Sequence, residues 1–600
     1  MCRIAAIISE NTNNLNVRIA SMTSAMHRGG PDDEGQLINN ELGYALGHRR
    51  LSIVDLSSNG HQPMKDDANE LEIIFNGEIY NYKELREELN AKGHQFFSDS
   101  DTEVLLKAYT EWGNNMLQKL KGMFAFIIIN KKTKTLFAAR DHAGIKPLYI
   151  ARANDEIIFS SEIRGIKALN ENWEENPNWK IWFLTYGFLP EPVTTLQNVS
   201  PLPRGHFITI NLETKEEKIG SFANYQFNTK PKSYQIAIEE TRKLVDASIK
   251  RHLIADVPVG VFLSGGIDSS ILTIVAQMQQ KSPIETISIY FDDEKYSEKK
   301  FQDIIVKQTG VKHHFHKISK QEFLDSWSDI YESLDQPSTD AINTYFICKY
   351  AKQNGLKVVL SGIGADEIFG GYPSINRVNK FNQYKRLAVL NRILPSILTN
   401  AYPNKKVEFL NKKIDSAEYL LYRGLFTPKD VAKILGINIK KVCEEIAKFK
   451  FQEDISKLTA QNRATYYETA VYMQNQLLKD SDSQSMWHSL ELRVPFLDKD
   501  LIDYVNNLST EIKFSTKKVK TLLVDAYIKE LPKLIWNRPK QGFTFPFENW
   551  FKTMTIFKNK QFVPDWALIM FMNKKINFSR LWAIFLTYGV DVLSNTKNLD

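Results

Sequence analysis

The second residue of the chain is a cysteine that could act as a nucleophile. Removal of the initiator methionine would leave Cys2 with a thiol and a free α-amine on one residue. A thiolate attacks well only when a base lies close, and an α-amine with a pKa of about 8 can be that base without any histidine. The plainer interpretation is a small apolar residue at the start of a strand, so the position of Cys2 alone does not decide its role.

A turn near the middle of the chain could bind an anion. An apolar run at 258–263 leads into small and polar residues, and an apolar helical stretch follows at 271–278. This turn contains Ser264, Gly265, Gly266, Asp268 and Ser269. Backbone N–H groups and hydroxyls at the positive end of a helix form an anion cradle. The turn is not a P-loop, since it lacks the Gly-Lys-Ser/Thr that follows four spacer residues there.

The same strand-turn-helix pattern returns at 358–372. Here the apolar strand is followed by Ser361 and Gly362, and Asp366 comes shortly after them. A glycine between a strand and a helix is often only a tight turn. The second occurrence of the pattern favours a phosphate site over that alternative.

The N-terminal part of the chain is predicted to consist of short strands and turns. Apolar or alternating runs bounded by Gly, Asn and Asp, which are typical of strands, occur at 3–9, 71–75, 123–129, 135–139 and 148–151. Helices are predicted at 83–91 and 102–112. Between 186 and 225 several prolines and glycines break regular structure, which suits a domain boundary.

A different pattern begins at about residue 233. Helices now alternate with short buried strands at 259–263, 286–290 and 357–360. This alternation predicts a parallel sheet with helices on both faces. Because a chain of 600 residues is too long for a single core, we expect an α/β protein of two domains. The predicted division is a first domain at 1–205, a connecting segment at 206–232 and a second domain at 233–600.

Composition excludes several classes of protein. The net charge is +7, but the basic residues are scattered and the densest run, Lys517, Lys518 and Lys520, is short, so we expect a solvated surface and no nucleic-acid partner. Three cysteines can form neither a disulfide framework nor a paired metal motif, which is typical of a reducing compartment. The sequence has neither the apolar segment of a signal peptide nor an apolar run of about 18 residues. We therefore expect a cytoplasmic protein with no membrane partner.

Four further motifs accompany Cys2, at 28–34, 47–52, 75–80 and 100–103. With Cys2 they resemble the glutaminase domain of the N-terminal-nucleophile amidotransferases, and specifically that of the asparagine synthetases. The resemblance implies a layered αββα fold like that of the N-terminal-nucleophile hydrolases. It also implies that Cys2 releases ammonia from glutamine.

The resemblance assigns roles within these motifs. Asn76 and Gly77 match the pair that stabilises the oxyanion formed on the way to a thioester. Arg49 would bind the α-carboxylate of glutamine in a bidentate fork, while Asp101 and nearby Glu78 would accept hydrogen bonds from its α-ammonium group. The alternatives are a surface ion pair for Arg49 and a helix N-cap for Asp101.

The turn at 264–270 resembles the pyrophosphate loop of enzymes that split ATP between its α and β phosphates. This implies adenylation by a domain of the adenine-nucleotide α-hydrolase type with a helical extension. By the same resemblance Asp268 and Asp366 would hold Mg²⁺ against the phosphates, and Lys520 would stabilise charge on the activated acyl group. The alternative for Lys520 is a solvated lysine in a basic run. The residues expected to line the ATP site are Leu263, Ser264, Gly265, Gly266, Asp268, Ser269, Ile289, Ser361 and Gly362. Blocks at 477–498 and 538–543 complete the resemblance.

Some positions depart from the family pattern. Ile363 stands between the two glycines of the second motif, where the family carries a glutamate that is thought to assist ammonia attack, and Val524 replaces a usual arginine. An isoleucine can neither take a proton nor carry charge, so either another group does this work or the acceptor differs. The variant with Pro373 and Ser374 is similar to a subgroup found in surface-polysaccharide or secondary biosynthesis.

The resulting hypothesis is a glutamine-dependent, asparagine synthetase-like ligase that uses ATP and Mg²⁺. Ammonia released at Cys2 would displace AMP from an adenylated carboxylate, preferably that of aspartate, after pyrophosphate has left. A sugar uronic acid or another small carboxylate is the alternative acceptor. A homodimer is also predicted.

Two rival classes explain the sequence less well. A non-catalytic relative would show damage at the nucleophile, the oxyanion pair or the pyrophosphate loop, yet Cys2, Asn76 and Asp268 are present. An RNA-modifying enzyme would need a clustered basic face, which the sequence does not contain.

Overall fold

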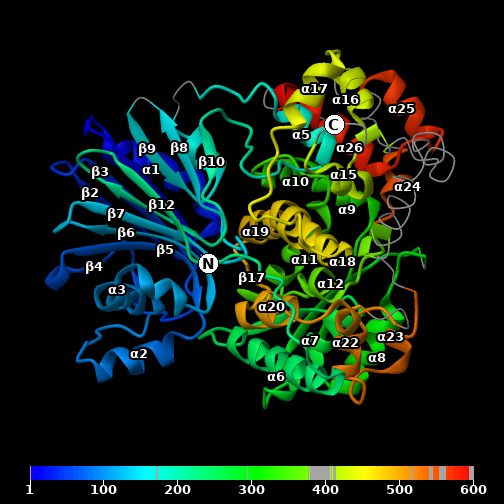
Figure 1. Cartoon of the computed structure of the whole chain (residues 1–600), viewed down its shortest axis with the longest axis horizontal. Coiled ribbons are helices and arrows are strands. Elements are labelled where there is room, and N and C mark those ends of the chain that lie inside the picture. Colours follow the sequence, from blue (N-terminus) through cyan, green and yellow to red (C-terminus); the bar gives the residue numbers. More distant parts are fainter. Residues whose placement is uncertain are drawn as a thin grey trace.

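The computed structural model describes most of the chain as two lobes. The described residues are 2–153, 155–169, 173–293, 295–375, 377–378, 406, 408–409, 414–514, 518–539, 545–552 and 563–593. One lobe is built on antiparallel sheets, and the other is largely helical around a parallel sheet (Figure 1). Of the motif predicted at 538–543, the residues after Pro539 lie outside the described ranges.

The N-terminal lobe contains two six-stranded antiparallel sheets. In spatial order the first sheet is β10 (Val199–Pro201), β8 (Tyr149–Ala153), β9 (Glu156–Ser160), β1 (Arg3–Ile8), β3 (Tyr44–Arg50) and β2 (Asp33–Asn39). The second is β12 (Glu217–Ser221), β11 (His206–Asn211), β7 (Thr135–Arg140), β6 (Gly122–Asn130), β5 (Leu71–Ile79) and β4 (Met64–Asp66). The predicted strands of this region are confirmed.

The alternation of side chains along each strand explains the layering of this lobe. Ile4 and Ile8 of β1 pack against the second sheet, whereas the intervening Ile7 packs against α1 (Leu15–Ala25). The outer face of the second sheet packs on α2 (Tyr82–Ala91) and α3 (Asp101–Trp112). The order helix, sheet, sheet, helix confirms the predicted αββα fold.

The second sheet continues past residue 205, where the first domain is predicted to end. Its strands β11 and β12 extend as far as Ser221. The reason is that β11 pairs with β7, a strand far back in the chain, and this pairing overrides the nearby prolines and glycines. At the other predicted boundary, the side chain of Ser233 caps α6 (Tyr234–His252).

The second domain is built on a five-stranded parallel sheet. Its spatial order is β15 (Lys312–Lys317), β14 (Glu285–Tyr290), β13 (Val259–Phe262), β16 (Val358–Leu360) and β17 (Glu491–Arg493). The predicted parallel sheet is confirmed, but β15 and β17 were missed. Both are rich in charged or histidine residues, and β17 is nevertheless fully buried because its side chains pair with the first domain.

Helices surround this sheet and form the predicted extension (Figure 1). Those nearest the sheet are α6, α7 (Ile267–Met278), α8 (Lys299–Thr309), α9 (Lys320–Asp325), α10 (Trp327–Ser333) and α11 (Ile342–Gln353). Those that follow are α12 (Ala365–Phe369), α15 (Ala417–Arg423), α16 (Pro428–Leu435), α17 (Ile439–Ile446), α18 (Ala460–Tyr466), a π-helix (Tyr467–Leu477), α19 (Leu478–Trp487), α20 (Lys499–Asn506), α21 (Thr510–Lys513), α22 (Thr521–Ala526), α23 (Lys533–Trp536), α24 (Phe547–Phe551), α25 (Asp565–Met572) and α26 (Phe578–Leu593). Within the described ranges, no helix has the length and apolar composition that crossing a bilayer requires.

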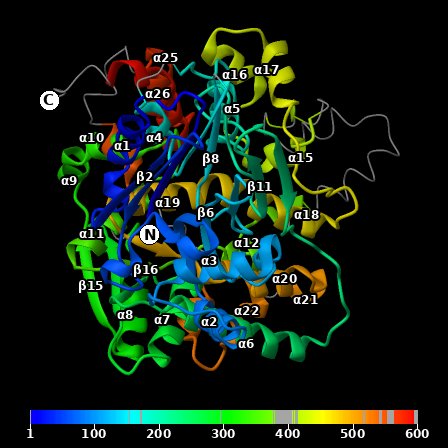
Figure 2. The ribbon, with the colours of Figure 1, turned by 90° about the vertical axis from the view of Figure 1, so that its left-hand side faces the viewer.

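Buried ion pairs join the two lobes. Nη1 of Arg3, at the start of β1, lies 2.8 Å from a carboxylate oxygen of Asp482 in α19. The same carboxylate pairs with Nζ of Lys146 at 3.2 Å. These groups are almost completely buried, and such pairs are strongly destabilising to break because a lone buried charge remains. The start of β1, and with it Cys2, therefore lies where the lobes meet (Figures 1 and 2).

Candidate functional sites

Cys2 lies at the start of the central strand of the first sheet and is 8% exposed. Its backbone N–H donates to Oδ1 of Asn76 at 3.2 Å. Burial raises the pKa of the thiol, while the N–H of Leu51 and the nearby charge of Arg50 act in the opposite direction. The thiol therefore needs a nearby base before it can attack.

Asn76 and Gly77 lie side by side on β5, next to Cys2. Because Oδ1 of Asn76 accepts from the chain at Cys2, its amide nitrogen is left as a donor, and this fully buried nitrogen has no hydrogen-bond partner among the described residues. A Cβ at Gly77 would lie 2.1 Å from the carbonyl oxygen of Met123, so only glycine fits there. An unpartnered buried donor beside a nucleophile is what an oxyanion site requires.

Two carboxylates line the same narrow pocket as Cys2. Asp101 accepts from the N–H of Ile79 at 2.9 Å, and burial raises its pKa to about 6. Asp101 is not the cap of α3, because that role belongs to the side chain of Ser100. Burial, with a contribution from Glu491, raises the pKa of Glu78. A bound ammonium group beside these two carboxylates would stabilise their ionised forms and so offset the cost of burying them.

The structure places Arg49 outside the Cys2 pocket. The side chain of Arg49 pairs with Glu34 at 2.8 Å and does not line the Cys2 pocket, whereas the neighbouring Arg50 does. Both arginines lie at the end of β3, where successive side chains point to opposite faces. Nη1 of Arg50 donates to the carbonyl oxygen of Ser57 at 2.9 Å and Nη2 donates to that of Asp55, which fixes its guanidinium beside the pocket.

The second pocket lies at the carboxyl ends of β13, β14 and β16 and has a volume of about 530 Å³. The sequence-predicted residues that line it are Leu263, Ser264, Gly266, Asp268, Ser269, Ile289, Ser361, Gly362, Asp366 and Lys520. Gly265 lies within the same turn but is not part of the lining. Crevices at the carboxyl ends of parallel strands are where open α/β sheets bind ligands.

Three charged groups meet at one end of this pocket. Nζ of Lys520 lies 2.6 Å from Oδ1 of Asp268 and 2.6 Å from Oδ1 of Asp366. Burial opposes the charge of this lysine, but the two aspartates raise its pKa above the ordinary value. Lys520 is only 4% exposed, so the alternative of a solvated lysine does not hold.

Comparison with known proteins agrees with this pair of pockets. A family model described as asparagine synthase matches residues 240–562, and one described as a glutamine amidotransferase domain matches residues 1–222. Asparagine synthetase (glutamine-hydrolyzing) 1 of Bacillus subtilis strain 168 is 36% identical over 545 residues, which cover 88% of this chain and 83% of the relative. The chain belongs to the asparagine synthase family.

Two further relatives carry different names. Asparagine synthetase (glutamine-hydrolyzing) 3 of B. subtilis strain 168 is 30% identical over 546 residues, which cover 87% of this chain and 83% of the relative. Amidase chry2 of Gibberella zeae is 26% identical over 589 residues, with 88% of this chain and 85% of the relative covered. This asparagine synthase family member is thus similar over most of its length to proteins of more than one name.

The carboxylates of this family member fit a divalent cation. Mg²⁺ prefers carboxylate oxygens, and Asp268 and Asp366 already converge on a single positive group, the ammonium of Lys520. A Cβ at Gly371 would lie 1.6 Å from Oδ1 of Asp366, so this glycine leaves room for the carboxylate. Among the described residues no cluster of three or more His, Cys, Asp or Glu side chains forms a metal site, so phosphate oxygens would have to complete the coordination.

The structure adds residues that the sequence analysis missed. Glu367 lines the second pocket and is 1% exposed; its Oε2 accepts from the N–H of Gly364 at 3.0 Å and its Oε1 from the hydroxyl of Tyr372 at 2.8 Å. Burial, with the charge of Asp366, raises the pKa of Glu367 to about 7. In the sequence, the only indication of a role for Glu367 is its position directly after Asp366. Only the fold shows that the carboxylate of Glu367 lies beside Ile363.

Proposed function

We propose that this asparagine synthase family member hydrolyses glutamine at Cys2 and uses the ammonia to form an amide from an adenylated carboxylate. The observation that carries the proposal is the presence in one chain of a buried cysteine beside the free amide donor of Asn76 and of a phosphate turn beside two aspartates and a buried lysine. Glutamine hydrolysis alone would not explain the phosphate turn, and adenylation alone would not explain the buried cysteine beside Asn76.

In the first pocket each group has a role in thioester chemistry. With the initiator methionine removed, the α-amine of Cys2 takes the thiol proton and the sulfur attacks the side-chain carbonyl of glutamine. The amide nitrogen of Asn76 and the N–H of Gly77 stabilise the oxyanion. Arg50 binds the α-carboxylate of glutamine, while Asp101 and Glu78 hold its ammonium group.

In the second pocket the turn from Ser264 to Ser269 holds the phosphates of ATP. Asp268 and Asp366 would bind Mg²⁺, which when present neutralises phosphate charge. Lys520 stabilises the negative charge that develops as the carboxylate attacks the α-phosphate. The products of this half are an acyl adenylate and pyrophosphate.

The contacts of Arg493 support the proposal that ammonia passes between the two pockets through the protein interior. Its Nη2 lies 3.5 Å from Oε2 of Glu78, which lines the first pocket. Its carbonyl oxygen accepts from the N–H of Ser361 at 2.8 Å, and Ser361 lines the second pocket. One buried residue therefore contacts a lining residue of each pocket, which makes a route through the interior short.

Glu367 replaces the family glutamate that is absent at Ile363. Its carboxylate hydrogen-bonds to the N–H of Gly364, the residue after Ile363, and its pKa of about 7 suits a general base near neutral pH. In this role it takes a proton from nitrogen as ammonia adds to the acyl carbon.

Aspartate is the acceptor that the names of the relatives favour, with asparagine as the product. The test is pyrophosphate release from ATP and Mg²⁺ in the presence of glutamine and aspartate, with the amide identified by mass. We expect equal amounts of pyrophosphate, AMP and asparagine. If another acid responds while aspartate is silent, the choice of acceptor is wrong; if no acid releases pyrophosphate, adenylation itself is wrong.

Two broader predictions belong to the same proposal. The cysteines Cys2, Cys348 and Cys443 are all free, which supports a cytoplasmic location. The predicted homodimer is testable by light scattering of the purified chain.

A further inference from the structure

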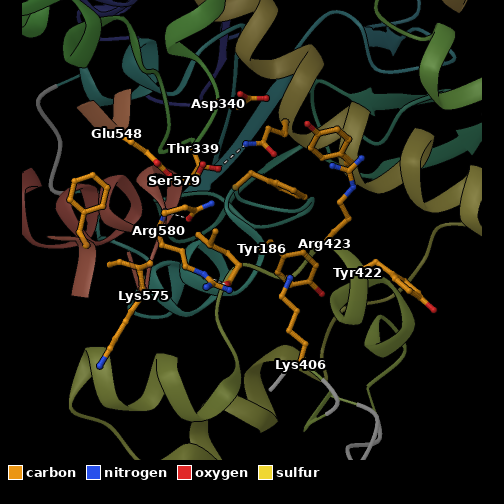
Figure 3. A pocket seen from close by; sticks show the side chains of 18 of the residues that line it. Tyr186, Thr339, Asp340, Lys406, Tyr422, Arg423, Glu548, Lys575, Ser579 and Arg580 are labelled. Atoms are coloured by element: carbon orange, nitrogen blue, oxygen red, sulfur yellow. Dashed lines mark hydrogen bonds between the residues drawn. The ribbon is translucent and has the colours of Figure 1, made fainter. Parts of the chain in front are cut away.

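A second large cavity adjoins the nucleotide pocket (Figure 3). It has a volume of about 740 Å³, and Asp340 and Tyr472 line both spaces. In the view of Figure 3, Lys406 extends into this cavity from its lower edge and Asp340 lies at the opposite edge. We call it the basic cavity, since its lining includes Lys406, Arg423, Lys552, Lys574, Lys575 and Arg580.

The charges in this lining are unbalanced. Among the lining residues that the structure describes, six basic side chains face two acidic ones, Asp340 and Glu548, which gives a net charge of +4 when all are ionised. Arg423 has a carboxylate partner, Glu468, at 2.6 Å. Across the ranges that the structure describes, the other five basic side chains form no ion pair. Such a concentration of one sign attracts anions.

The basic groups also lie close enough to oppose one another. Burial, together with the charges of Arg580 and Arg423, lowers the pKa of Lys406 to about 8. Arg580 donates from Nε to the carbonyl oxygen of Leu425 at 3.0 Å, which fixes its guanidinium at the wall of the cavity. Like charges held together in a half-buried space are destabilising unless an anion binds between them.

We propose that the basic cavity binds a small molecule that carries a phosphate or diphosphate group, next to the site of acyl transfer. The volume is in the range of small-molecule sites and exceeds what a single amino acid fills. Arginine and lysine are the side chains that recognise phosphate oxygens. The tyrosines Tyr186, Tyr419 and Tyr422 supply flat, partly apolar walls for the rest of such a ligand.

The phosphate group could be part of the acceptor acid or of a separate ligand, and both cases share the same recognition chemistry. If it is part of the acceptor, the carboxylate would lie at the junction formed by Asp340 and Tyr472. Only this acceptor case rests on the proposed amide synthesis. Binding of the phosphate group itself requires no catalysis, so it can fail or succeed separately.

The test is calorimetric titration of the full-length chain with pyrophosphate and with uridine diphosphate glucuronate. Saturating α,β-methylene-ATP keeps the nucleotide pocket filled, so the remaining binding reports on the basic cavity. We expect both diphosphates to bind, and the double variant Lys406→Gln/Arg580→Gln to weaken binding by at least about tenfold. The matched control Lys433→Gln/Lys441→Gln changes two exposed lysines outside the cavity and should bind as the parent does.

A second variant tests the proposal independently in case the first variant does not fold. Lys574→Gln/Lys575→Gln alters exposed residues at the rim of the cavity and should also weaken diphosphate binding while leaving the thermal midpoint unchanged. Amidation of uridine diphosphate glucuronate would place the phosphate on the acceptor. A change in the KM for aspartate on adding pyrophosphate that both cavity variants lose would place it on a separate ligand, because product inhibition at the nucleotide pocket would persist in those variants. Absence of diphosphate binding, or equal binding by the parent and both cavity variants, would overturn the proposal.

Discussion

The two pockets that face the domain boundary differ in how they hold their chemical groups. The Cys2 pocket is narrow, and the donors that would stabilise the oxyanion lie on β5, a strand with every residue buried. The nucleotide pocket is about 530 Å³ and takes its polar groups from turns at strand ends and the first turns of helices. A small, single substrate suits a site fixed on strands, whereas two successive ligands and a leaving pyrophosphate need a wider space.

The difference also concerns charge. In the Cys2 pocket, burial raises the pKa values of Glu78 and Asp101, even though Arg493 lies 3.5 Å from Glu78. In the nucleotide pocket, Asp268 and Asp366 already hold the ammonium of Lys520. The first site is thus prepared for the ammonium of an amino acid, and the second for polyanionic phosphate together with a cation.

The substitution with the largest expected effect inactivates the Cys2 pocket and leaves the nucleotide pocket active. Cys2→Ala removes the nucleophile, so glutamine-dependent amide formation should fall on the order of 10⁴-fold or more. Ammonia-dependent formation should be unchanged, because the nucleotide pocket contains no part of Cys2. Parallel assays with glutamine and with ammonium chloride measure both. Equal activity with glutamine before and after the change would remove Cys2 from the mechanism.

A smaller effect tests the oxyanion site. Asn76→Ala removes the only side-chain donor assigned to the oxyanion, and we expect glutamine hydrolysis to slow by about 10² to 10³-fold in kcat. The KM for glutamine should change little, since the donor acts in the transition state. Asn13→Ala, an exposed asparagine before α1, is the matched control. A large rise in KM with unchanged kcat would assign Asn76 to substrate binding.

The next largest effect tests Glu367, the proposed general base of the nucleotide pocket. Glu367 must be ionised to accept a proton, and its pKa is raised to about 7, so ammonia-dependent synthesis, measured at a constant concentration of unprotonated ammonia, should fall as the pH drops below about 7. Glu367→Gln should lower the rate by about 10²-fold and abolish this acid limb. Exchange of pyrophosphate into ATP should persist, because adenylation does not use the base. Loss of exchange together with synthesis would show that Glu367 only supports the fold around Asp366.

The smallest effect distinguishes two neighbouring arginines. Arg50→Lys should raise the KM for glutamine by about tenfold or more, because a lysine cannot form the bidentate fork. Arg49→Lys should have no such effect, since Arg49 pairs with Glu34 at a partly exposed position. Initial rates over a range of glutamine concentrations compare the two variants. The reverse order of effects would restore Arg49 as the carboxylate ligand.

Much of the candidate site could be predicted from short stretches of sequence. The turn after β13 and the glycine at position 77 depend on local backbone geometry, so neighbouring residues are sufficient to indicate them. The same is true of the layered and parallel sheets, whose strands follow the alternation of apolar residues. These features are where prediction and structure agree.

Features that depend on contacts between distant segments could not be predicted in this way. The face of β3 that Arg50 occupies, the burial of the charged strand β17 and the pairing of β11 with β7 are fixed by long-range sheet register. The basic cavity likewise gathers α15, α26 and residue 406 around one space.

The sequence by itself therefore determined which chemical groups this protein carries and in which local turns they stand. Only the tertiary structure decided which side chains share a pocket, as with Glu367 beside Ile363 and Lys520 between two aspartates. The physical reason is that backbone propensity acts over a few residues, whereas the direction and burial of a side chain depend on packing against segments far away in the chain.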